Sequence, residues 1–409
     1  MPGSLIQGNA LHIPLKDKSV QLCCFSPPYW NLRKYSVPDI EFPDRWKGQM
    51  GLEPTIDQFL DNLMLAMAEV WRVLRDDGCV FVNIGDSYWS PAGSYNSRKH
   101  GKTSQRAGRK DVTGLPLHRG NKSDNPDMRP KSLCLIPQRF AIRCQEAGWI
   151  VRSEVIFHKL NPIPESCTDR PTKSHEQVWM LTKTGKYFWD QEAVKEKTRR
   201  IAKVGWKDSD LKKYSCDPRL EKQGTYKDWR KYCPTGAVNK RNIRSVWTMA
   251  TESRPEAHFA TFSSKLVDII IRAGSSPRAC EICGAPWVRI VEKKSNTMNI
   301  RVRDAKKGIL DQKSGCGITR VSEKELKEYG KEQNGTSKTL GWRKTCKCDC
   351  VGTGRCVVLD PFVGVGTSVL VAEKHGRAGV GIDLSLEYLV DIALKKIRVP
   401  IQKMLELRF

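Results

Sequence analysis

Residues 357–385 read VVLDPFVGVGTSVLVAEKHGRAGVGIDLS, and this stretch decides the fold. An apolar strand runs into Asp360, and in the turn that follows Gly364 and Gly366 let the backbone approach a ligand closely. A helix comes next, and a second apolar strand then ends in Asp383, 17 residues after Gly366. This order predicts a β-α-β unit of a doubly wound, mostly parallel α/β sheet.

The same stretch indicates the class of ligand. A carboxylate at the end of the second strand, here Asp383, can accept hydrogen bonds from both hydroxyls of a ribose. A nicotinamide dinucleotide would require a third glycine at position 369, where the chain has Val369, and no other pyrophosphate-binding feature replaces it. A nucleoside without pyrophosphate fits better, and S-adenosylmethionine is the obvious ligand of that class. The alternative is an ordinary β-α-β unit with a glycine turn.

A second motif, SPPYW at residues 26–30, directly follows the apolar run VQLCCF at residues 20–25. The run has the length of a buried strand and ends abruptly at the prolines. Strands of an open α/β sheet present their carboxyl ends to the ligand, so we expect this motif beside the glycine turn. The alternative is a proline-containing turn after a core strand.

The residue types of this motif suit the binding of an amine. Pro27 and Pro28 fix the backbone, so that the Pro27 carbonyl is held rigidly. Together with the Ser26 side chain, that carbonyl can accept hydrogen bonds from a planar exocyclic amino group, and Tyr29 supplies a stacking face. An amine held in this way is bent toward tetrahedral geometry, which frees its lone pair to attack a sulfonium methyl group in line. Trp30 is expected to add a second wall.

The rest of the chain continues the alternation of strands and helices. Thr55 and Gln58 have capping-box spacing, and the apolar stripe after them predicts a helix that Gly78 stops. Strand, helix and strand in this order favour a parallel sheet covered on both faces. Similar patterns predict strands at 79–84, 149–157 and 177–182 and helices at 137–147 and 263–273.

Composition excludes some classes of protein. With 409 residues, 39% hydrophobic and 28% charged, the chain can bury a full core, which excludes intrinsic disorder and a disulfide-stapled miniprotein. The net charge of +25 favours a polyanionic partner, nucleic acid ahead of an anionic membrane. No apolar run approaches the roughly 18 residues of a spanning helix, and the start lacks the order of a signal peptide. We therefore expect a cytoplasmic protein with no membrane partner.

Two stretches concentrate the positive charge. From 91 to 131 the chain is rich in Gly, Ser and Asn, with 10 Lys and Arg against 3 Asp and Glu, which predicts a long mobile loop. From 195 to 244, 16 Lys and Arg against 6 acidic residues are interleaved with Trp and Tyr. Aromatic residues among lysines favour a nucleic-acid surface over a merely solvated face. The residues assigned to phosphate contacts there are Lys212, Lys213, Arg230 and Lys231.

The 15 cysteines favour free thiols or metal ligands over disulfides, because the count is odd and the chain is long and has no secretion signal. Paired thiolates at the two bases of a loop suit a tetrahedral, structural zinc ion. The second cluster offers three cysteines, 346, 348 and 350, for two places, so reduced free thiols are the alternative. The candidate zinc ligands, which flank a polar, Lys-rich insertion, are Cys280, Cys283, Cys346 and Cys348.

Residues 26–29 together with 360–368 resemble the β group of amino-methylating DNA methyltransferases, in which S/D/N-P-P-Y/F precedes D-P-F-x-G-x-G-T. Residues 8–11 resemble the G-D-A/S-L element of that group, with Asn9 where the family usually has Asp, and residues 258–262 resemble the element that cradles the methionine moiety. The resemblance implies a Rossmann-like S-adenosylmethionine-dependent methyltransferase fold, circularly permuted so that the first and last strands lie side by side. The cofactor-binding residues that it implies are Asn9, His258, Phe259, Thr261, Asp360, Phe362, Gly364, Gly366, Thr367 and Asp383.

The resemblance implies methyl transfer from S-adenosylmethionine to an exocyclic amine of a base flipped out of double-stranded DNA. The order with the catalytic motif first resembles enzymes acting on DNA rather than on RNA or protein. Ser at its first position resembles the N4-cytosine subgroup, with N6-adenine as the alternative. Cytosine-C5 methylation would need a Pro-Cys nucleophile, which the chain lacks. The catalytic residues are then Ser26, Pro27, Pro28 and Tyr29.

A different class of protein, a non-catalytic zinc-containing DNA-binding protein, would explain the charge and the cysteines. It would leave both motifs without a role. The sequence leaves open the recognition site, the oligomeric state and whether a cognate restriction nuclease is a partner.

These motifs and inserts predict seven segments. They are the catalytic half of the core at 1–90, a basic mobile loop at 91–131, the core continued at 132–193, a basic target-recognition region at 194–257, a cofactor-cradling helix at 258–276, a cysteine-flanked insertion at 277–350 and the cofactor-binding half of the core at 351–409.

Overall fold

A computed structural model describes most of the chain, whose residues fall into two compact units. The first unit consists of Met1–Ala193, Arg244–Val288 and Trp342–Phe409, and the second of Val194–Ile243 and Arg289–Gly341. The described residues are 3–32, 34–35, 37–89, 128–162, 164–197, 240–251, 262–292, 338–350, 353–393 and 401–403. Most of the predicted loop at 91–131, most of the basic region at 194–257 and the centre of the cysteine-flanked insertion lie outside them.

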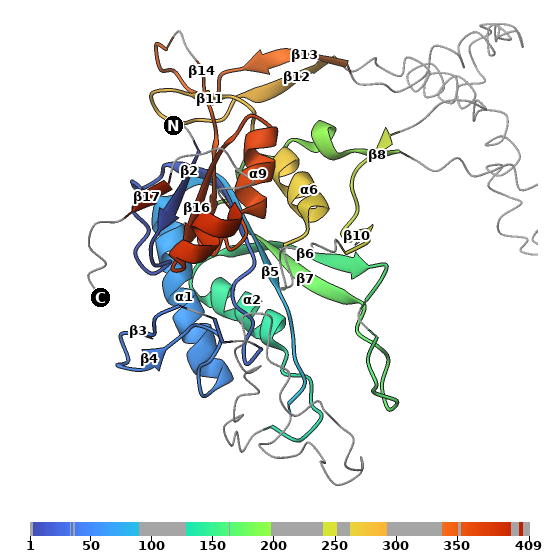
Figure 1. The fold of residues 1–409 in the computed structure, drawn as a ribbon. Helices are drawn as coiled ribbons and strands as arrows, with labels where there is room; N and C mark the ends of the chain where they lie inside the picture. The colour runs from blue at the N-terminus through green and yellow to red at the C-terminus, as the bar shows by residue number, and fades with distance from the viewer. Residues whose placement is uncertain are drawn as a thin grey trace, which may run out of the picture. The chain divides into compact units, whose positions relative to one another are not determined.

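The first unit is built on a nine-stranded sheet with the order β10-β6-β7-β5-β2-β15-β16-β1-β17 (Figure 1). All neighbours pair in parallel except β7, which is antiparallel to both β5 and β6. The prediction of a doubly wound, mostly parallel sheet is therefore confirmed. The strands are β1 (Ser4–Gln7), β2 (Val20–Phe25), β5 (Leu74–Ile84), β6 (Ile150–Lys159), β7 (His175–Thr182), β10 (Val246–Met249), β15 (Val357–Asp360), β16 (Ala378–Asp383) and β17 (Ile401–Lys403).

The two ends of the chain meet in the middle of this sheet. Strand β1 lies between β16 and β17, and β2 pairs with β15, so that Leu22 lies opposite Val358 and Cys23 opposite Leu359. The expectation that the first and last strands lie side by side is confirmed. From β15 the sheet continues through β16 in one direction and through β2 in the other. The strand order therefore switches direction between β15 and β2, and such a switch is where ligands bind in open α/β sheets.

Helices cover both faces of the sheet. Helices α1 (Ile56–Val73) and α2 (Ile136–Glu146) pack together on one face, and α6 (Ser264–Gly274) and α9 (Thr367–Lys374) pack together on the other (Figure 1). All six residues of β2 are buried, with Cys23 and Phe25 in the core cluster under α1. Leu22 points the other way, toward Gly274 of α6. Burial on both faces explains why this strand is an unbroken apolar run.

The remaining elements are short. They are β3 (Ile40–Glu41), β4 (Lys47–Gly48), the 3-10 helix Gln191–Val194, β8 (Glu196–Lys197), β9 (Lys240–Arg241), β11 (Ala279–Cys280), β12 (Val288–Glu292), β13 (Lys338–Arg343), β14 (Thr353–Gly354) and the π-helix Tyr388–Ala393.

Helix α1 begins as predicted and ends earlier than predicted. The Thr55 side chain accepts a hydrogen bond from the Gln58 N–H at 3.2 Å, as the capping-box spacing indicates. The helix stops at Val73, and Leu74 already has the extended backbone of β5. Gly78 therefore lies inside a strand, and its assignment as the helix stop is wrong. A Cβ atom there would lie 2.9 Å from the Gln21 carbonyl oxygen, so glycine permits the close approach of β5 to β2.

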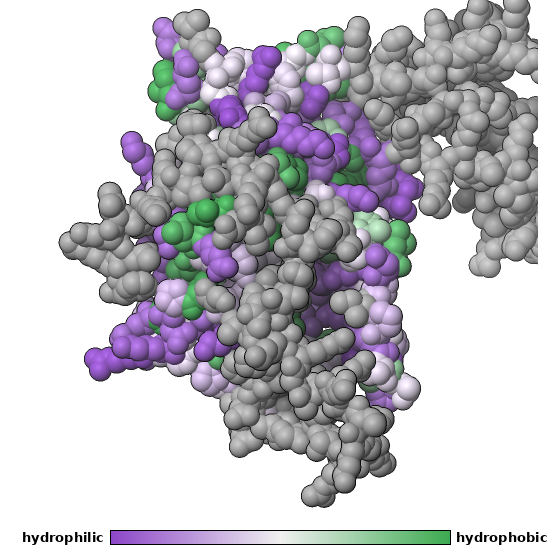
Figure 2. Space-filling view, viewed as in Figure 1, coloured by the Kyte–Doolittle hydropathy of each residue, from purple (hydrophilic) through white to green (hydrophobic). Residues whose placement is uncertain are grey.

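Polar residues dominate the described surface on the face shown in Figure 2, and apolar residues occur there only in small groups. Within the described ranges, no helix combines the length and the apolar character that crossing a membrane requires.

The close approach at Gly78 generates a stability prediction. The Gly78→Ala variant should be less stable by about 1–3 kcal/mol, because its methyl group would collide with the backbone of β2. The control is Gly185→Ala, where a Cβ atom would meet nothing within 4 Å, and its stability should be unchanged or slightly higher. Urea unfolding of the three proteins measures both effects. Equal stabilities of the two variants would contradict the packing described for β2 and β5.

Candidate active site

The two sequence motifs lie at the same edge of the sheet, as predicted. Asp360 ends β15, and Ser26 follows the last residue of the neighbouring strand β2. The Phe25 and Phe362 rings join the two segments, with their centroids 5.5 Å apart. This is the carboxyl edge of the parallel strands at the point where the strand order switches direction.

The glycine turn after β15 has the backbone conformation for which glycine was predicted. Gly364 and Gly366 have φ values of +48° and +79°, in the left-handed region that L side chains rarely adopt. A Cβ atom at Gly364 would meet nothing within 4 Å, so the turn faces open space. Gly366 directly precedes α9, whose first residue is Thr367. The turn therefore leaves backbone accessible beside a helix N-terminus.

The Asp383 carboxylate closes this turn from the end of β16. Its two oxygens accept hydrogen bonds from the Gly364 N–H at 2.9 Å and the Ser385 N–H at 2.8 Å. Burial raises the pKa of Asp383, and these two N–H groups partly oppose the rise. Because each carboxylate oxygen can accept two hydrogen bonds, both oxygens keep acceptor capacity for ribose hydroxyls.

Asp360 is more deeply buried, with 3% of its surface exposed. The Ser368 hydroxyl donates to one of its oxygens at 2.5 Å, and the Phe362 N–H donates to the other at 3.0 Å. Burial, with a smaller contribution from the nearby Asp383, raises the pKa of Asp360 to about 7 despite these donors. Asp360 thus holds the turn in shape from beneath, and Asp383 presents the carboxylate next to it.

The residues around the turn fit a nucleoside cofactor. The Thr367 hydroxyl is buried and has no hydrogen-bond partner in the described chain, so a polar group remains available there. Asn9 follows β1 at the same edge, where the Gly8 N–H donates to the Asp383 carbonyl at 3.0 Å, and its amide oxygen accepts from the Leu11 N–H at 3.0 Å. The predicted cofactor residues His258, Phe259 and Thr261 lie outside the described residues.

The catalytic motif is held by a hydrogen-bond network that extends to β7. The Tyr29 hydroxyl donates to Glu176 Oε2 at 3.1 Å, and Asn83 Nδ2 donates to that same hydroxyl at 3.1 Å and to Glu176 Oε2 at 2.9 Å. Lys159 forms an ion pair with the other Glu176 oxygen. Burial raises the pKa of Tyr29, and the neighbouring Glu176 charge raises it further, so the phenol keeps its proton.

The network sets the direction of the Ser26 hydroxyl. Tyr29 has one hydroxyl proton, and the Glu176 carboxylate, which can only accept, takes it. Ser26 Oγ lies 3.3 Å from the Tyr29 oxygen and must therefore be the donor in that contact. The Ser26 proton points at Tyr29, so its lone pairs remain available as acceptors. The motif thus presents the Ser26 oxygen as an acceptor, the role that the sequence assigned to it.

Glycine also sets the position of the Tyr29 ring. A Cβ atom at Gly85, directly after β5, would lie 2.4 Å from the Tyr29 ring. The ring therefore packs against the Gly85 backbone and is only half-buried. Its remaining accessible surface is what a stacking role requires.

The prediction that Trp30 forms a second wall for a base is wrong. The Trp30 indole is 3% exposed, stacks on Trp89 at a centroid distance of 6.4 Å and donates its N–H to the Glu53 carbonyl at 3.0 Å. The buried Glu53 side chain accepts hydrogen bonds from the Gly51 N–H at 2.7 Å and from Asn62 of α1 at 3.1 Å. Trp30 is therefore a core residue that ties the segment after the catalytic motif to α1.

The structure describes the predicted zinc ligands but not the predicted phosphate-binding residues. The ligand atoms of Cys280, Cys283, Cys346 and Cys348 all lie within 4.8 Å of one another, so the structure brings this set together. The predicted phosphate-binding residues Lys212, Lys213, Arg230 and Lys231 lie outside the described residues.

Sequence reasoning missed Glu176, Asn83 and Lys159. Each lies near the end of a strand, but β7 runs antiparallel to its neighbours, so its first residues reach the edge where the other strands finish. The sequence pattern gives no strand direction, and Glu176 directly precedes the predicted strand. An acidic residue at a strand start was the one available signal.

Comparison with known proteins identifies relatives. The family N6_N4_Mtase, described as DNA methylase, matches residues 20–332. The chain is 36% identical over 277 residues to the type II methyltransferase M.Cfr9I of Citrobacter freundii, which covers 67% of this chain and 73% of that protein. It is 32% identical over 252 residues to the type II methyltransferase M.SmaI of Serratia marcescens, which covers 62% of this chain and 68% of that protein.

A similar solved structure is that of the PvuII DNA methyltransferase (cytosine-N4-specific), with a TM-score of 0.47 and 14% sequence identity. The match covers 95% of this chain and 84% of that one.

The raised pKa of Asp360 predicts a pH dependence of stability. Between the unfolded pKa near 4 and the folded value of about 7, the folded chain holds a proton that the unfolded chain releases. Its contribution to the free energy of unfolding therefore falls as pH rises through this window, by up to about 1.4 kcal/mol per pH unit. The Asp360→Asn variant should lack this decline, so its stability relative to the natural chain should rise from pH 4 to pH 7.

Denaturant unfolding at several pH values measures this difference. The control is Asp39→Asn, the same chemical change at an exposed position, whose difference from the natural chain should stay nearly constant. A flat difference for Asp360→Asn as well would show that Asp360 ionises normally in the folded chain.

Proposed function

Because this chain belongs to the N6_N4 DNA methylase family and is a type II DNA methyltransferase, we propose that it methylates the exocyclic N4 amine of cytosine. The methyl donor is S-adenosylmethionine, and the cytosine is flipped out of duplex DNA. The observation that carries the proposal is the direction of the hydrogen bonds from Ser26 through Tyr29 to Glu176.

The amine is held by acceptors only. Ser26 Oγ directs its proton to Tyr29 and offers lone pairs, and the Pro27 carbonyl offers another acceptor at the same edge. A donor beside the amine would instead compete for the nitrogen lone pair. With both amine protons bound by acceptors, that lone pair is free for in-line attack on the methyl carbon. The nitrogen–carbon bond would form as the carbon–sulfur bond breaks, leaving a neutral thioether, and the amine would lose one proton. Tyr29, anchored by Glu176 at one end, stacks its half-buried ring on the base.

Several residues at the carboxyl edge would hold the cofactor. Asp383 accepts the ribose hydroxyls, the Gly364 to Gly366 turn lets the backbone approach, and the Thr367 hydroxyl supplies a further polar group. When bound, S-adenosylmethionine supplies the sulfonium methyl group. Asp360 acts beneath the turn by holding the Phe362 N–H and the Ser368 hydroxyl in place. Its role is therefore to position the turn.

Cytosine is proposed ahead of adenine because the first motif position is Ser26, which resembles the N4-cytosine subgroup of the family. An N6-adenine enzyme would use the same acceptors on another exocyclic amine. The two activities therefore share the mechanism and differ in the base.

Duplex DNA is the proposed partner, and a cognate restriction nuclease is the proposed companion of the modification activity. The basic region at 194–257 supplies phosphate contacts in this proposal. A second source is the basic stretch at 91–131, where Trp89, just before the stretch, pairs with residues at its end. The Trp89 N–H donates to the Ser132 carbonyl at 2.7 Å, and the Lys131 N–H donates to the Trp89 carbonyl at 2.9 Å.

The product distinguishes the two bases. After incubation with mixed-sequence DNA and S-adenosylmethionine, digestion and mass analysis should find N4-methylcytosine. A Ser26→Ala variant should lower turnover more than it lowers cofactor affinity, because it removes an acceptor for the amine alone. Finding N6-methyladenine would overturn the base assignment and leave the mechanism intact. Finding 5-methylcytosine would overturn both.

Glu176 is proposed as a positioning residue. In Glu176→Gln the new amide can donate to the Tyr29 oxygen, so the Tyr29 hydroxyl can turn its proton toward Ser26. The Ser26 hydroxyl can then point its own proton at the amine. We expect kcat to fall on the order of 10²-fold, with the Kd for S-adenosylmethionine nearly unchanged. The control is Glu154→Gln on β6, an exposed position. Equal kcat values for the two variants would remove Glu176 from the mechanism.

A further inference from the structure

The first half of the cysteine cluster is a tight turn. Cys280 ends β11, and the Gly284 N–H donates to the Cys280 carbonyl at 2.9 Å. Gly284 has a φ of +68°, which a residue with a side chain would adopt only with strain. The Cys280 N–H donates to the Ala285 carbonyl at 2.9 Å, so the chain returns on itself. The turn brings the Cys280 and Cys283 side chains together, as a C-x-x-C metal knuckle requires.

The second half of the cluster comes from a distant part of the chain. Cys346 and Cys348 lie on the segment that follows β13, and the Thr345 hydroxyl on that segment donates to the Pro286 carbonyl at 2.7 Å. The sulfur atoms of Cys280, Cys283, Cys346 and Cys348 all lie within 4.8 Å of one another. Zinc–sulfur bonds of about 2.3 Å place the sulfur atoms of a tetrahedral site about 3.8 Å apart. Four sulfur atoms are therefore already close to the spacing of such a site.

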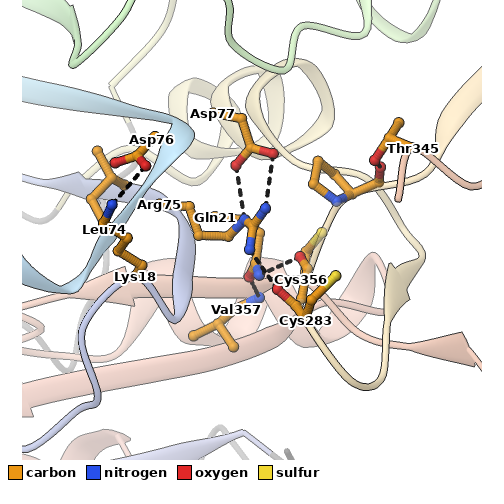
Figure 3. Close-up of polar contacts among 12 residues, drawn as sticks. Lys18, Gln21, Leu74, Arg75, Asp76, Asp77, Cys283, Thr345, Cys356 and Val357 are labelled. Carbon is orange, nitrogen blue, oxygen red and sulfur yellow. Dashed lines mark hydrogen bonds and ion pairs between the residues drawn. The ribbon is translucent and has the colours of Figure 1, made fainter. Parts of the chain in front are cut away.

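A third observation is that the protein core holds the backbone of the knuckle (Figure 3). Arg75, at the start of β5, donates to the Cys283 carbonyl at 2.5 Å, and Asp77 fixes its guanidinium through contacts of 2.8 and 3.1 Å. Gln21 of β2 is buried, donates to the Gly284 carbonyl at 2.7 Å and accepts from the Val357 N–H at 2.5 Å. Consecutive carbonyls of the knuckle are thus bound by two side chains of the sheet.

We propose that Cys280, Cys283, Cys346 and Cys348 bind one zinc ion as thiolates, and that this site is a structural clasp. The segment between Cys283 and Cys346 includes residues 289–341 of the second unit. The ion joins the two points at which that segment leaves and re-enters the first unit, and Gln21 and Arg75 fix the clasp to the sheet.

The placement of the clasp separates it from the methyl transfer. Gln21 and Arg75 lie at the amino ends of their strands, whereas Ser26 follows the carboxyl end of β2. Ser26 lies five residues after Gln21 in the chain, or about 16 Å along the strand direction. The zinc ion therefore has a structural role and does not touch the reacting groups.

The test begins with the metal content of the full chain, purified without chelator in the presence of reductant. Mass spectrometry should find one zinc ion per chain, given four thiolate ligands. Exchange for cobalt should produce the intense thiolate-to-cobalt absorption of a tetrahedral sulfur site. A fully folded, reduced protein with no zinc and no such absorption after cobalt addition would overturn the proposal, and so would disulfides between these cysteines.

Three serine variants locate the ligands. Cys283→Ser should lose most of the bound zinc. Cys350→Ser is the matched control, because Cys350 Sγ lies 3.5 Å from Cys280 Sγ but outside the proposed set, and it should keep the ion. Loss of zinc from Cys350→Ser with retention in Cys348→Ser would overturn the ligand assignment. If a variant fails to fold, the natural chain can be titrated with an organomercurial that blocks its thiols. The amount of zinc released per thiol blocked then gives the number of thiolates that bind each ion.

The anchoring role of Arg75 has its own readout. Arg75→Met should keep one zinc ion but release it several-fold faster to a chromogenic chelator, because the Cys283 carbonyl loses its donor. Lys18→Met, which removes only the exposed ion pair with Asp76 shown nearby in Figure 3, should leave the rate unchanged. Equal release rates for all three proteins would overturn the anchoring. None of these readouts depends on methylation of DNA, so they stand apart from the proposed function.

Discussion

The parallel pairing of β2 with β15 is the interaction on which the rest of the structure depends. It joins segments from opposite ends of the chain, and Gln21 and Val357, which hydrogen-bond across it, are 336 residues apart. Burial of both faces of β2 offsets the entropy of closing so long a loop. The pairing also creates the switch in strand order, because β16 and β5 continue the sheet in opposite directions. Without this pairing, Ser26 and Asp360, which are far apart in the sequence, would not lie at the same edge of one sheet.

The carboxyl edge of the sheet contains buried polar groups that lower the stability of the folded chain. Asp360 and Asp383 are carboxylates whose pKa values burial raises, and the Thr367 hydroxyl is buried without a partner. Each of these features costs stability, since buried polar groups normally require full hydrogen bonding. The Thr367 hydroxyl and the remaining acceptor capacity of Asp383 lie beside the glycine turn, where a ligand would satisfy them. This edge is therefore organised for binding, and the neighbouring helices and strands supply the stability.

The sequence allowed prediction of those features that local patterns determine. The apolar run of β2, the glycine turn and the Thr55 cap follow from residue types at fixed spacing, and the structure confirms them. Non-local contacts were not predictable. Trp30 looked like a binding residue until its contact with Trp89 placed it in the core, and Glu176 acquired its role only because β7 runs antiparallel. Both outcomes depend on what the fold brings near, which residue type alone does not encode.

The two edges of the sheet differ in how their hydrogen-bonding groups are used. The carboxyl edge must leave acceptors open. The Ser26 hydroxyl donates its proton to Tyr29, whose own proton is bound by Glu176, so the Ser26 lone pairs stay available. The amino edge must hold a long insertion in place, so the carbonyls after Cys280 are bound by Gln21 and Arg75. Had the insertion joined the sheet at the carboxyl edge, its N–H donors would have competed with the amine for the open acceptors. Separation along the strands therefore allows one sheet to carry both an open site and a closed clasp.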